Sequence, residues 1–241
     1  RRVAGEGPSI VATQDAPRLN TPDWLWTRWT AAYGAATARA IAKAHLDEPP
    51  LDFSVKADPK HWAEALGARI LPTGTLRRAG GGRIDDLPGY RDGTWWVQDA
   101  AAALPARLLD VKPGETVVDL CAAPGGKTAQ LVAAGATVTA LDIAPTRLKR
   151  LEDNLARLNL TARTLCADAR GWRPETPADA VLLDAPCSAT GTIRRHPDLP
   201  WIKNADNIAE TMPMQRALLD AAVAMVRPGG RIVYAVCALE P

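Results

Sequence analysis

The chain has 241 residues, of which 47% are hydrophobic, and a formal net charge of +2. This length allows one large α/β domain or a medium domain with a smaller companion, and no stretch approaches the roughly 18 apolar residues of a membrane span. The near-neutral charge excludes a bulk basic surface, so any nucleic-acid contact must come from local clusters of charge.

The four cysteines, Cys121, Cys166, Cys187 and Cys237, lie far apart and form no CxxC motif. This spacing argues against a zinc site and against the disulfide framework of a secreted protein. The start of the chain also lacks the apolar segment of a signal peptide. We therefore expect a reducing, cytoplasmic environment and no metal, and we interpret Cys121 and Cys166 as small core residues.

The first part of the chain predicts a small α+β domain over residues 20–93. Residues 1–19 are interpreted as the tail of an upstream region. A helix start follows, with Thr21 as N-cap, proline at the first position and aspartate in the first turn. The elements predicted next are a helix over 24–46, a strand at Leu51–Val55 and a helix over Pro59–Leu66.

From about residue 94 to the end of the chain, strands and helices alternate. The strands are apolar runs such as TVVDL at Thr116–Leu120, which is typical of a parallel sheet covered on both faces. We therefore predict a doubly wound α/β domain over residues 94–241. Its predicted strands are 116–120, 137–141, 163–166, 180–183 and 231–236, and its helices are 98–109, one within 121–134, 145–158 and 206–226.

A glycine-rich stretch, CAAPGGKT at 121–128, follows the first strand of this domain. Gly125 and Gly126 permit close backbone approach, and the following helix offers free N–H groups to a polar ligand. The stretch matches neither GxGxxG nor GxxxxGK[ST], which weakens a dinucleotide or P-loop interpretation.

Acidic residues follow the next three strands, at the sheet edge where such folds bind ligands. Asp142 can accept hydrogen bonds from ribose hydroxyls, Asp168 can accept one from an adenine amino group, and Asp184 ends the fourth strand. Each acid alone fits equally well as a helix N-cap or a solvated carboxylate. The regular set favours a nucleotide-like cofactor.

Two cysteines and a basic cluster lie just beyond the last two strands. Cys187 and Cys237 each follow a strand end, so each is open to interpretation as a reactive thiol, a helper to one, or a small buried residue. Arg194, Arg195 and His196 fit either RNA phosphate contacts or a solvated basic loop.

Taken together, the motifs resemble S-adenosylmethionine-dependent RNA cytosine-C5 methyltransferases, most closely the bacterial Sun/Fmu (RsmB-like) enzymes that act on 16S ribosomal RNA. The resemblance extends into the small domain, through RLNTPDWL at 18–25 and GTWWVQD at 93–99. The motifs that carry it in the second domain are CAAPGGKT at 121–128, LDI at 141–143, ADA at 167–169, DAPCSATGTIRRHPD at 184–198 and YAVCAL at 234–239.

The resemblance implies a Rossmann-like methyltransferase domain, S-adenosylmethionine as cofactor and 16S ribosomal RNA as partner, in a monomer without membrane contact. Cys237 is implied as the nucleophile, Cys187 as the residue that assists product release, and Asp184 as a contact to both base and cofactor. The cluster Arg194, Arg195 and His196 is implied to bind RNA. The implied cofactor-binding residues are Cys121, Ala122, Ala123, Pro124, Gly125, Gly126, Lys127, Asp142, Asp168 and Asp184.

The resemblance also shapes the expected domain organisation. Residues 1–19 match the end of a helical, NusB-like domain that is otherwise missing, and the catalytic domain over 94–241 is expected to be truncated at its C-terminus. The run Ala235-Val236-Cys237-Ala238 departs from the more polar Ser-Thr-Cys-Ser that is usual in the family.

Two alternatives remain open. In a DNA cytosine-C5 methyltransferase, Cys187 would be the nucleophile, but that mechanism has no use for Cys237. A non-catalytic RNA-binding or ribosome-assembly factor on a methyltransferase scaffold would not need the complete set of acids and thiols.

Overall fold

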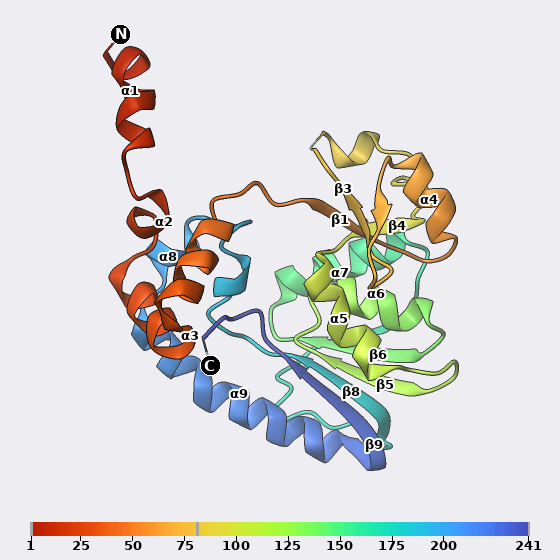
Figure 1. Ribbon diagram of the computed structural model, residues 1–241. Coiled ribbons are helices and arrows are strands. Elements are labelled where there is room, and N and C mark those ends of the chain that lie inside the picture. Colours follow the sequence, from red (N-terminus) through yellow and green to blue (C-terminus); the bar gives the residue numbers. More distant parts are fainter. Residues whose placement is uncertain (1, 81, 241) are drawn as a thin grey trace. The chain divides into compact units, whose positions relative to one another are not determined.

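A computed structural model describes residues 2–80 and 82–240 of the chain (Figure 1). These residues form two compact units, each assembled from segments that are distant in sequence. Neither described range contains a helix whose length and apolar character would suit a bilayer crossing. The larger unit comprises Pro50–Pro186 and Pro213–Val236, and the smaller comprises residues 2–49, 187–212 and 237–240.

The larger unit is built on a five-stranded sheet in which every pairing is parallel. The strand order β7-β6-β5-β8-β9 changes direction at β5, as in doubly wound folds. The predicted α/β class and parallel sheet are therefore confirmed. The strands are β5 Thr116–Leu120, β6 Thr137–Asp142, β7 Arg163–Cys166, β8 Ala178–Asp184 and β9 Val226–Ala235.

The last strand begins earlier than predicted. It starts at Val226 and continues through a Pro-Gly-Gly run to the predicted start at Arg231. The pairing tolerates this run because β8 advances only from Ala178 to Ala180 while β9 advances from Val226 to Arg231, which makes a bulge. Proline and glycine indicate a loop in sequence, and the bulge lets the strand continue through them.

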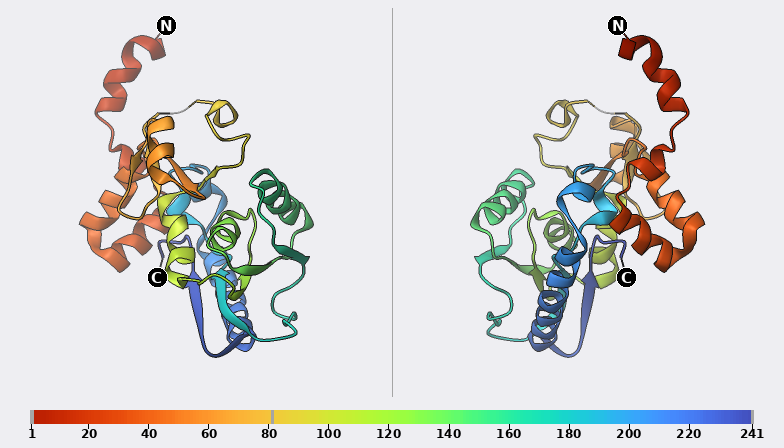
Figure 2. Two further views of the ribbon diagram at one scale, coloured as in Figure 1. Left: turned by 90° about the vertical axis from the view of Figure 1, so that its right-hand side faces the viewer. Right: turned by 90° about the vertical axis from the view of Figure 1, so that its left-hand side faces the viewer.

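Helices cover both faces of this sheet, and the cores beneath them are apolar (Figure 1, Figure 2). In α7, the predicted helical spacing of Leu148, Leu151 and Leu155 turns all three leucines into the core. One face carries α5 Ala100–Leu109, α6 Gly126–Ala133 and α7 Pro145–Arg157, and the other carries residues 213–225 of α9 Ala205–Met225.

The same unit contains a separate antiparallel sheet with the order β2-β3-β1-β4. Its core is formed by Phe53, Leu76 and Trp95, all of them fully buried. The sheet includes the strand predicted at Leu51–Val55 and accompanies the helix predicted over Pro59–Leu66. Its elements are β1 Leu51–Val55, α4 Pro59–Ala65, β2 Arg69–Ile70, β3 Leu76–Arg78, the 3-10 turn η1 Ile84–Asp86 and β4 Trp95–Val97.

The smaller unit is helical and packs around Leu25, Trp29 and Ile193. The predicted Thr21 N-cap is wrong: Pro22 occupies the cap position of α3, and the Thr21 hydroxyl donates instead to the Pro17 carbonyl. The elements are α1 Arg2–Ala12, α2 Ala16–Leu19, α3 Asp23–Ala44 with a kink at Gly34, the 3-10 turn η2 Thr190–Thr192, α8 Leu199–Ile202 and residues 205–212 of α9.

The predicted domain boundaries at residues 20 and 94 stay predictions. The two units divide the chain differently, because residues 20–49 belong with the smaller unit. Strand β4 also lies just beyond the predicted boundary at 93 while it pairs with β1 in the antiparallel sheet. The assignment of residues 1–19 to a helical upstream domain is likewise untested.

Candidate active site

The turn after β5 contains backbone conformations that few residues adopt. Cys121 has a φ of +59°, and Gly125, which precedes α6, has a φ of +98°. A Cβ atom on Gly125 would lie 2.9 Å from Leu151 Cγ, so this position needs glycine for space as well as for conformation. The turn leads into the start of α6, whose first N–H groups have no partner within the helix. The backbone here is open to a polar ligand.

Asp142, at the end of β6, holds this turn in place. Its carboxylate accepts hydrogen bonds from the Ala123 N–H at 3.2 Å and the Ala144 N–H at 3.0 Å. Arg147 lies 3.3 Å from the same carboxylate, whose side chain is 1% exposed. The predicted ribose-binding acid is thus also a structural support of the glycine-rich turn.

Asp184 and Lys127 form an ion pair. Lys127 Nζ donates to Asp184 Oδ2 at 2.7 Å, and the two side chains are 14% and 33% exposed. Lys127 lies at the start of α6, and Asp184 is the last residue of β8. The sequence predicts that both residues lie near the carboxyl ends of the parallel strands, and the structure shows that they contact each other there.

Asp168 is engaged by a neighbour that sequence reasoning missed. Arg170 donates to both carboxylate oxygens of Asp168 through its guanidinium and its backbone N–H. This contact lowers the pKa of Asp168 from its ordinary value, chiefly through the side-chain hydrogen bond. The signal was present in sequence, since an arginine two residues after an aspartate lies within reach of its carboxylate.

A second missed residue is Asp119, the fourth of the five residues of β5. It is fully buried, and burial raises the pKa of its carboxyl to about 7. Its Oδ2 accepts a hydrogen bond from the Thr128 hydroxyl at 2.6 Å, whereas its Oδ1 has no hydrogen-bond partner. The only sequence feature that could have drawn attention to Asp119 was the presence of an acid in the otherwise apolar strand TVVDL.

The two cysteines of interest both lie in the smaller unit, and the structure brings them together. Cys187 Sγ and Cys237 Sγ are 3.5 Å apart. The Gly191 N–H donates to the Cys237 carbonyl at 2.8 Å, which joins the two loops that carry the thiols. In the chain, Cys187 follows the last residue of β8 by three positions, and Cys237 follows the last residue of β9 by two.

The other two cysteines differ from one another. Burial, followed by the charge of Asp142, raises the pKa of Cys121 to about 12, so its thiol is not ionised at neutral pH. The interpretation of Cys166 as a core residue is wrong, because Cys166 is exposed. It is the final residue of β7, an edge strand, and its Sγ lies 3.7 Å from the Ile143 carbonyl oxygen.

The basic cluster at 194–196 is partly engaged within the smaller unit. Arg194 Nε donates to the Asp47 carbonyl at 2.9 Å, and its Nη2 donates to the Glu48 carbonyl at 2.8 Å. Arg194 therefore ties the end of the α3 segment to this loop. Arg195 is half-buried and His196 is exposed.

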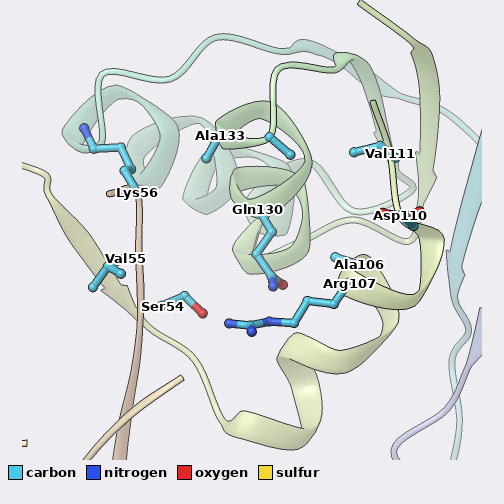
Figure 3. A pocket seen from close by; sticks show the side chains of 10 residues that line it. Ser54, Val55, Lys56, Ala106, Arg107, Asp110, Val111, Gln130 and Ala133 are labelled. Carbon is cyan, nitrogen blue, oxygen red and sulfur yellow. The ribbon is translucent and has the colours of Figure 1, made fainter. Parts of the chain in front are cut away.

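A hollow of about 360 Å³ lies away from all of these residues (Figure 3). Arg107, Gln130 and Ser54 turn toward one another at its centre, and Lys56 and Asp110 lie at its margin. None of the predicted site residues lines it. Within residues 2–80 and 82–240, no group of three or more metal-ligating side chains occurs.

Comparison with known proteins agrees with this architecture. Residues 106–241 match the sequence model described as 16S rRNA methyltransferase RsmB/F. The chain is 48% identical to ribosomal RNA small subunit methyltransferase B of Vibrio cholerae, over 98% of this chain and 58% of that protein.

Solved structures show the same fold. PH0851 superposes with a TM-score of 0.83 at 32% identity, over 94% of this chain and 56% of that one. A methyltransferase homologue from Pyrococcus horikoshii superposes with a TM-score of 0.76 at 28% identity, over 89% and 73% of the two chains. The chain thus spans little more than half the length of the curated relative from Vibrio cholerae. On the extent of these matches, the chain belongs to the 16S rRNA methyltransferase RsmB/F family.

Proposed function

We propose that this chain contains the catalytic part of an S-adenosylmethionine-dependent methyltransferase that modifies carbon-5 of a cytosine in 16S ribosomal RNA. The observation that carries the proposal is the pair of cysteines whose Sγ atoms lie 3.5 Å apart. This chemistry has a use for two thiols, because one forms a covalent adduct and the other helps to dissolve it. The similarity to ribosomal RNA small subunit methyltransferase B of Vibrio cholerae supports ribosomal RNA as the substrate.

The residues of the larger unit fit the proposed cofactor. Asp119 Oδ1 is a buried acceptor without a partner, and the glycines of the turn leave the backbone accessible. Asp142 would hold the ribose and Cys121–Lys127 would surround the methionine portion. When bound, S-adenosylmethionine supplies an electrophilic methyl group.

Asp168 is the proposed partner of the adenine amino group. Arg170 already occupies both of its carboxylate oxygens. Adenine binding therefore requires this ion pair to open. The side chains of Arg170 and Asp168 are 48% and 39% exposed, so solvent screens this ion pair and opening it costs little.

The proposed chemistry begins at Cys237. Its thiolate adds to carbon-6 of cytosine, which turns the ring into an enamine with a nucleophilic carbon-5. After carbon-5 is methylated, a base must remove its proton so that the Cys237 thiol can leave. We assign Cys187 to this release step and Asp184 to contacts with the N3/N4 edge of the base and with the cofactor.

The target base must lie in an unpaired loop or leave its stack to reach a catalytic pocket. We propose that the loop at 194–196 contacts RNA phosphates. The Arg194 guanidinium already donates to the carbonyls of Asp47 and Glu48, so an RNA contact by Arg194 would have to replace these hydrogen bonds.

The proposal is tested by incubating the chain with methyl-labelled S-adenosylmethionine and purified 16S or 23S ribosomal RNA. Nucleoside mass spectrometry should find labelled 5-methylcytidine in the 16S sample, and Cys237→Ala should abolish it. Calorimetry on the same preparation should show S-adenosylmethionine binding. Binding without any methylated nucleoside in 16S RNA, or no binding at all, would favour a non-catalytic scaffold.

A further inference from the structure

The carboxylate of Glu240 accepts hydrogen bonds from two other segments of the smaller unit. Trp29 Nε1 of α3 donates to Oε1 at 3.1 Å. The hydroxyls of Ser188 and Thr190 both donate to Oε2, each at 2.7 Å. Trp29, Ser188 and Thr190 are at most 4% exposed, so these donors have little access to water. Glu240 is therefore their main partner.

These contacts join the two loops that carry the cysteines. Ser188 directly follows Cys187, and Glu240 comes three residues after Cys237. The Leu239 N–H adds a further link by donating to the Thr190 hydroxyl at 3.0 Å.

The backbones of the two loops also lie close together. A Cβ atom on Gly191 would lie 2.7 Å from the Cys237 carbonyl oxygen, so only glycine leaves room for the other loop here. The side-chain contacts of Glu240 and the backbone contact at Gly191 thus both join the two loops within four residues of the thiols.

The strength of these hydrogen bonds follows from their chemistry. A carboxylate that accepts from neutral donors forms charge-assisted bonds, which are about twice as strong as neutral ones. Removing the carboxylate would leave Trp29 Nε1 without its acceptor and the Ser188 and Thr190 hydroxyls with only each other, 3.3 Å apart. A buried donor that loses its acceptor destabilises the arrangement. The loops would then lose the register that holds Cys237 beside Cys187.

We propose that Glu240 is a positioning residue, which fixes Cys237 relative to Cys187 through the Ser188–Thr190 loop. The consequence for catalysis rests on the proposed function, in which Cys237 attacks carbon-6. The geometric part concerns only the two thiols and holds whether or not methyl transfer occurs.

The geometric part is tested by the rate at which oxidised glutathione converts the two thiols into a disulfide. In this reaction the thiols lose two protons and two electrons, and glutathione disulfide is reduced to two molecules of glutathione. We expect Glu240→Ala to slow formation of the Cys187–Cys237 disulfide by about tenfold, measured by peptide mass spectrometry, because a displacement of about 1 Å costs large factors in rate. Glu210→Ala is the matched control, since Glu210 is exposed on α9 in the same unit.

The catalytic part is tested with the same variants in the methylation assay. Glu240→Ala should lower kcat by about tenfold or more and change the KM for RNA by less than about threefold, as expected for lost alignment rather than lost binding. Glu240→Gln should fall between the wild type and Glu240→Ala, because the amide keeps one acceptor oxygen. Ser188→Ala, which removes one donor, should have a smaller effect and should add nothing to Glu240→Ala.

The outcomes separate the two proposals. If Glu240→Ala oxidises and methylates like the Glu210→Ala control, the positioning role is wrong. If the wild type methylates no RNA but Glu240→Ala still slows disulfide formation, the proposed function fails and the positioning role stands. If Glu240→Ala does not fold, Ser188→Ala and Glu240→Gln decide the question, and wild-type rates in both would overturn the proposal.

Discussion

At the scale of single residues, burial decides what the acids and thiols of this chain can do. Asp119 and Cys121 lie close together in sequence, and burial raises the pKa of both. The Cys121 thiol therefore stays protonated at neutral pH, and the Asp119 carboxyl ionises much less readily than an exposed aspartate. Asp184 is a third exposed and paired with Lys127, which leaves part of its carboxylate open to a ligand.

The raised pKa of Asp119 predicts a specific dependence of stability on pH. A carboxyl whose pKa rises from 3.8 to about 7 on folding holds its proton more tightly in the folded state. Its contribution to stability is complete below about pH 4 and is lost as the pH rises toward 7. Relative to Asp119→Asn, which cannot ionise, the wild type should therefore lose free energy of unfolding between about pH 4 and pH 7.

Urea unfolding followed by tryptophan fluorescence at several pH values measures this difference. The difference in free energy of unfolding between the wild type and Asp119→Asn should change steadily up to about pH 7 and then level off. Parallel pH profiles for the two proteins would show that Asp119 does not titrate in this range.

At the scale of elements, a buried glutamine joins the antiparallel sheet to the helix of the glycine-rich turn. Gln98 Oε1 accepts from Ser54 Oγ at 2.7 Å and from Trp96 Nε1 at 2.9 Å. Its Nε2 donates to Gln130 Oε1 of α6 at 2.7 Å. Strand β1 and helix α6 are thereby linked through one side chain that is 7% exposed.

Removal of this side chain should weaken the link. Gln98→Ala would leave the Ser54 hydroxyl and the Trp96 N–H without their acceptor inside the protein. We expect the free energy of unfolding to fall by about 2–3 kcal/mol, the usual cost of orphaned buried polar groups. The affinity for S-adenosylmethionine should fall as well, because α6 begins at the glycine-rich turn.

Urea denaturation and calorimetry measure these two effects. Gln14→Ala, at an exposed position, is the control and should leave both quantities unchanged. A loss of less than about 0.5 kcal/mol in Gln98→Ala, the usual range for surface substitutions, would mean that the network carries little stability.

The elements also show how far the sequence alone can lead. Strand β5 and strand β7 have the predicted bounds, because apolar runs bordered by charged or turn residues are local signals. The bulge in β9 could not be predicted, since it depends on pairing with β8. Thr21 failed as an N-cap for a similar reason, because its hydroxyl found a carbonyl in the preceding helix.

For the candidate site, sequence reasoning proposed residues at the strand ends but could not predict their partners. The acids at the strand ends could be found because parallel strands end at one edge. The Lys127–Asp184 pair, the engagement of Arg194 and the Glu240 contacts join segments far apart in the chain, and no local pattern reveals them.

At the scale of the whole molecule, the two units carry different parts of the proposed reaction. The larger unit contains the glycine-rich turn and the acids that we assign to the cofactor. The smaller unit contains Cys187 and Cys237. The chain passes from one unit to the other between Pro186 and Cys187 and again between Val236 and Cys237. The chain belongs to the RsmB/F family, and in the function proposed here Cys237 would form the bond to RNA.

The most direct test of that account is the covalent adduct with RNA that contains 5-fluorocytosine, whose fluorine blocks the release step. The wild type, Cys187→Ala and Cys237→Ala are each incubated with this RNA and S-adenosylmethionine, and the products are separated on a denaturing gel. Adducts are predicted for the wild type and for Cys187→Ala, and none for Cys237→Ala. An adduct that persists in Cys237→Ala and disappears in Cys187→Ala would contradict the account.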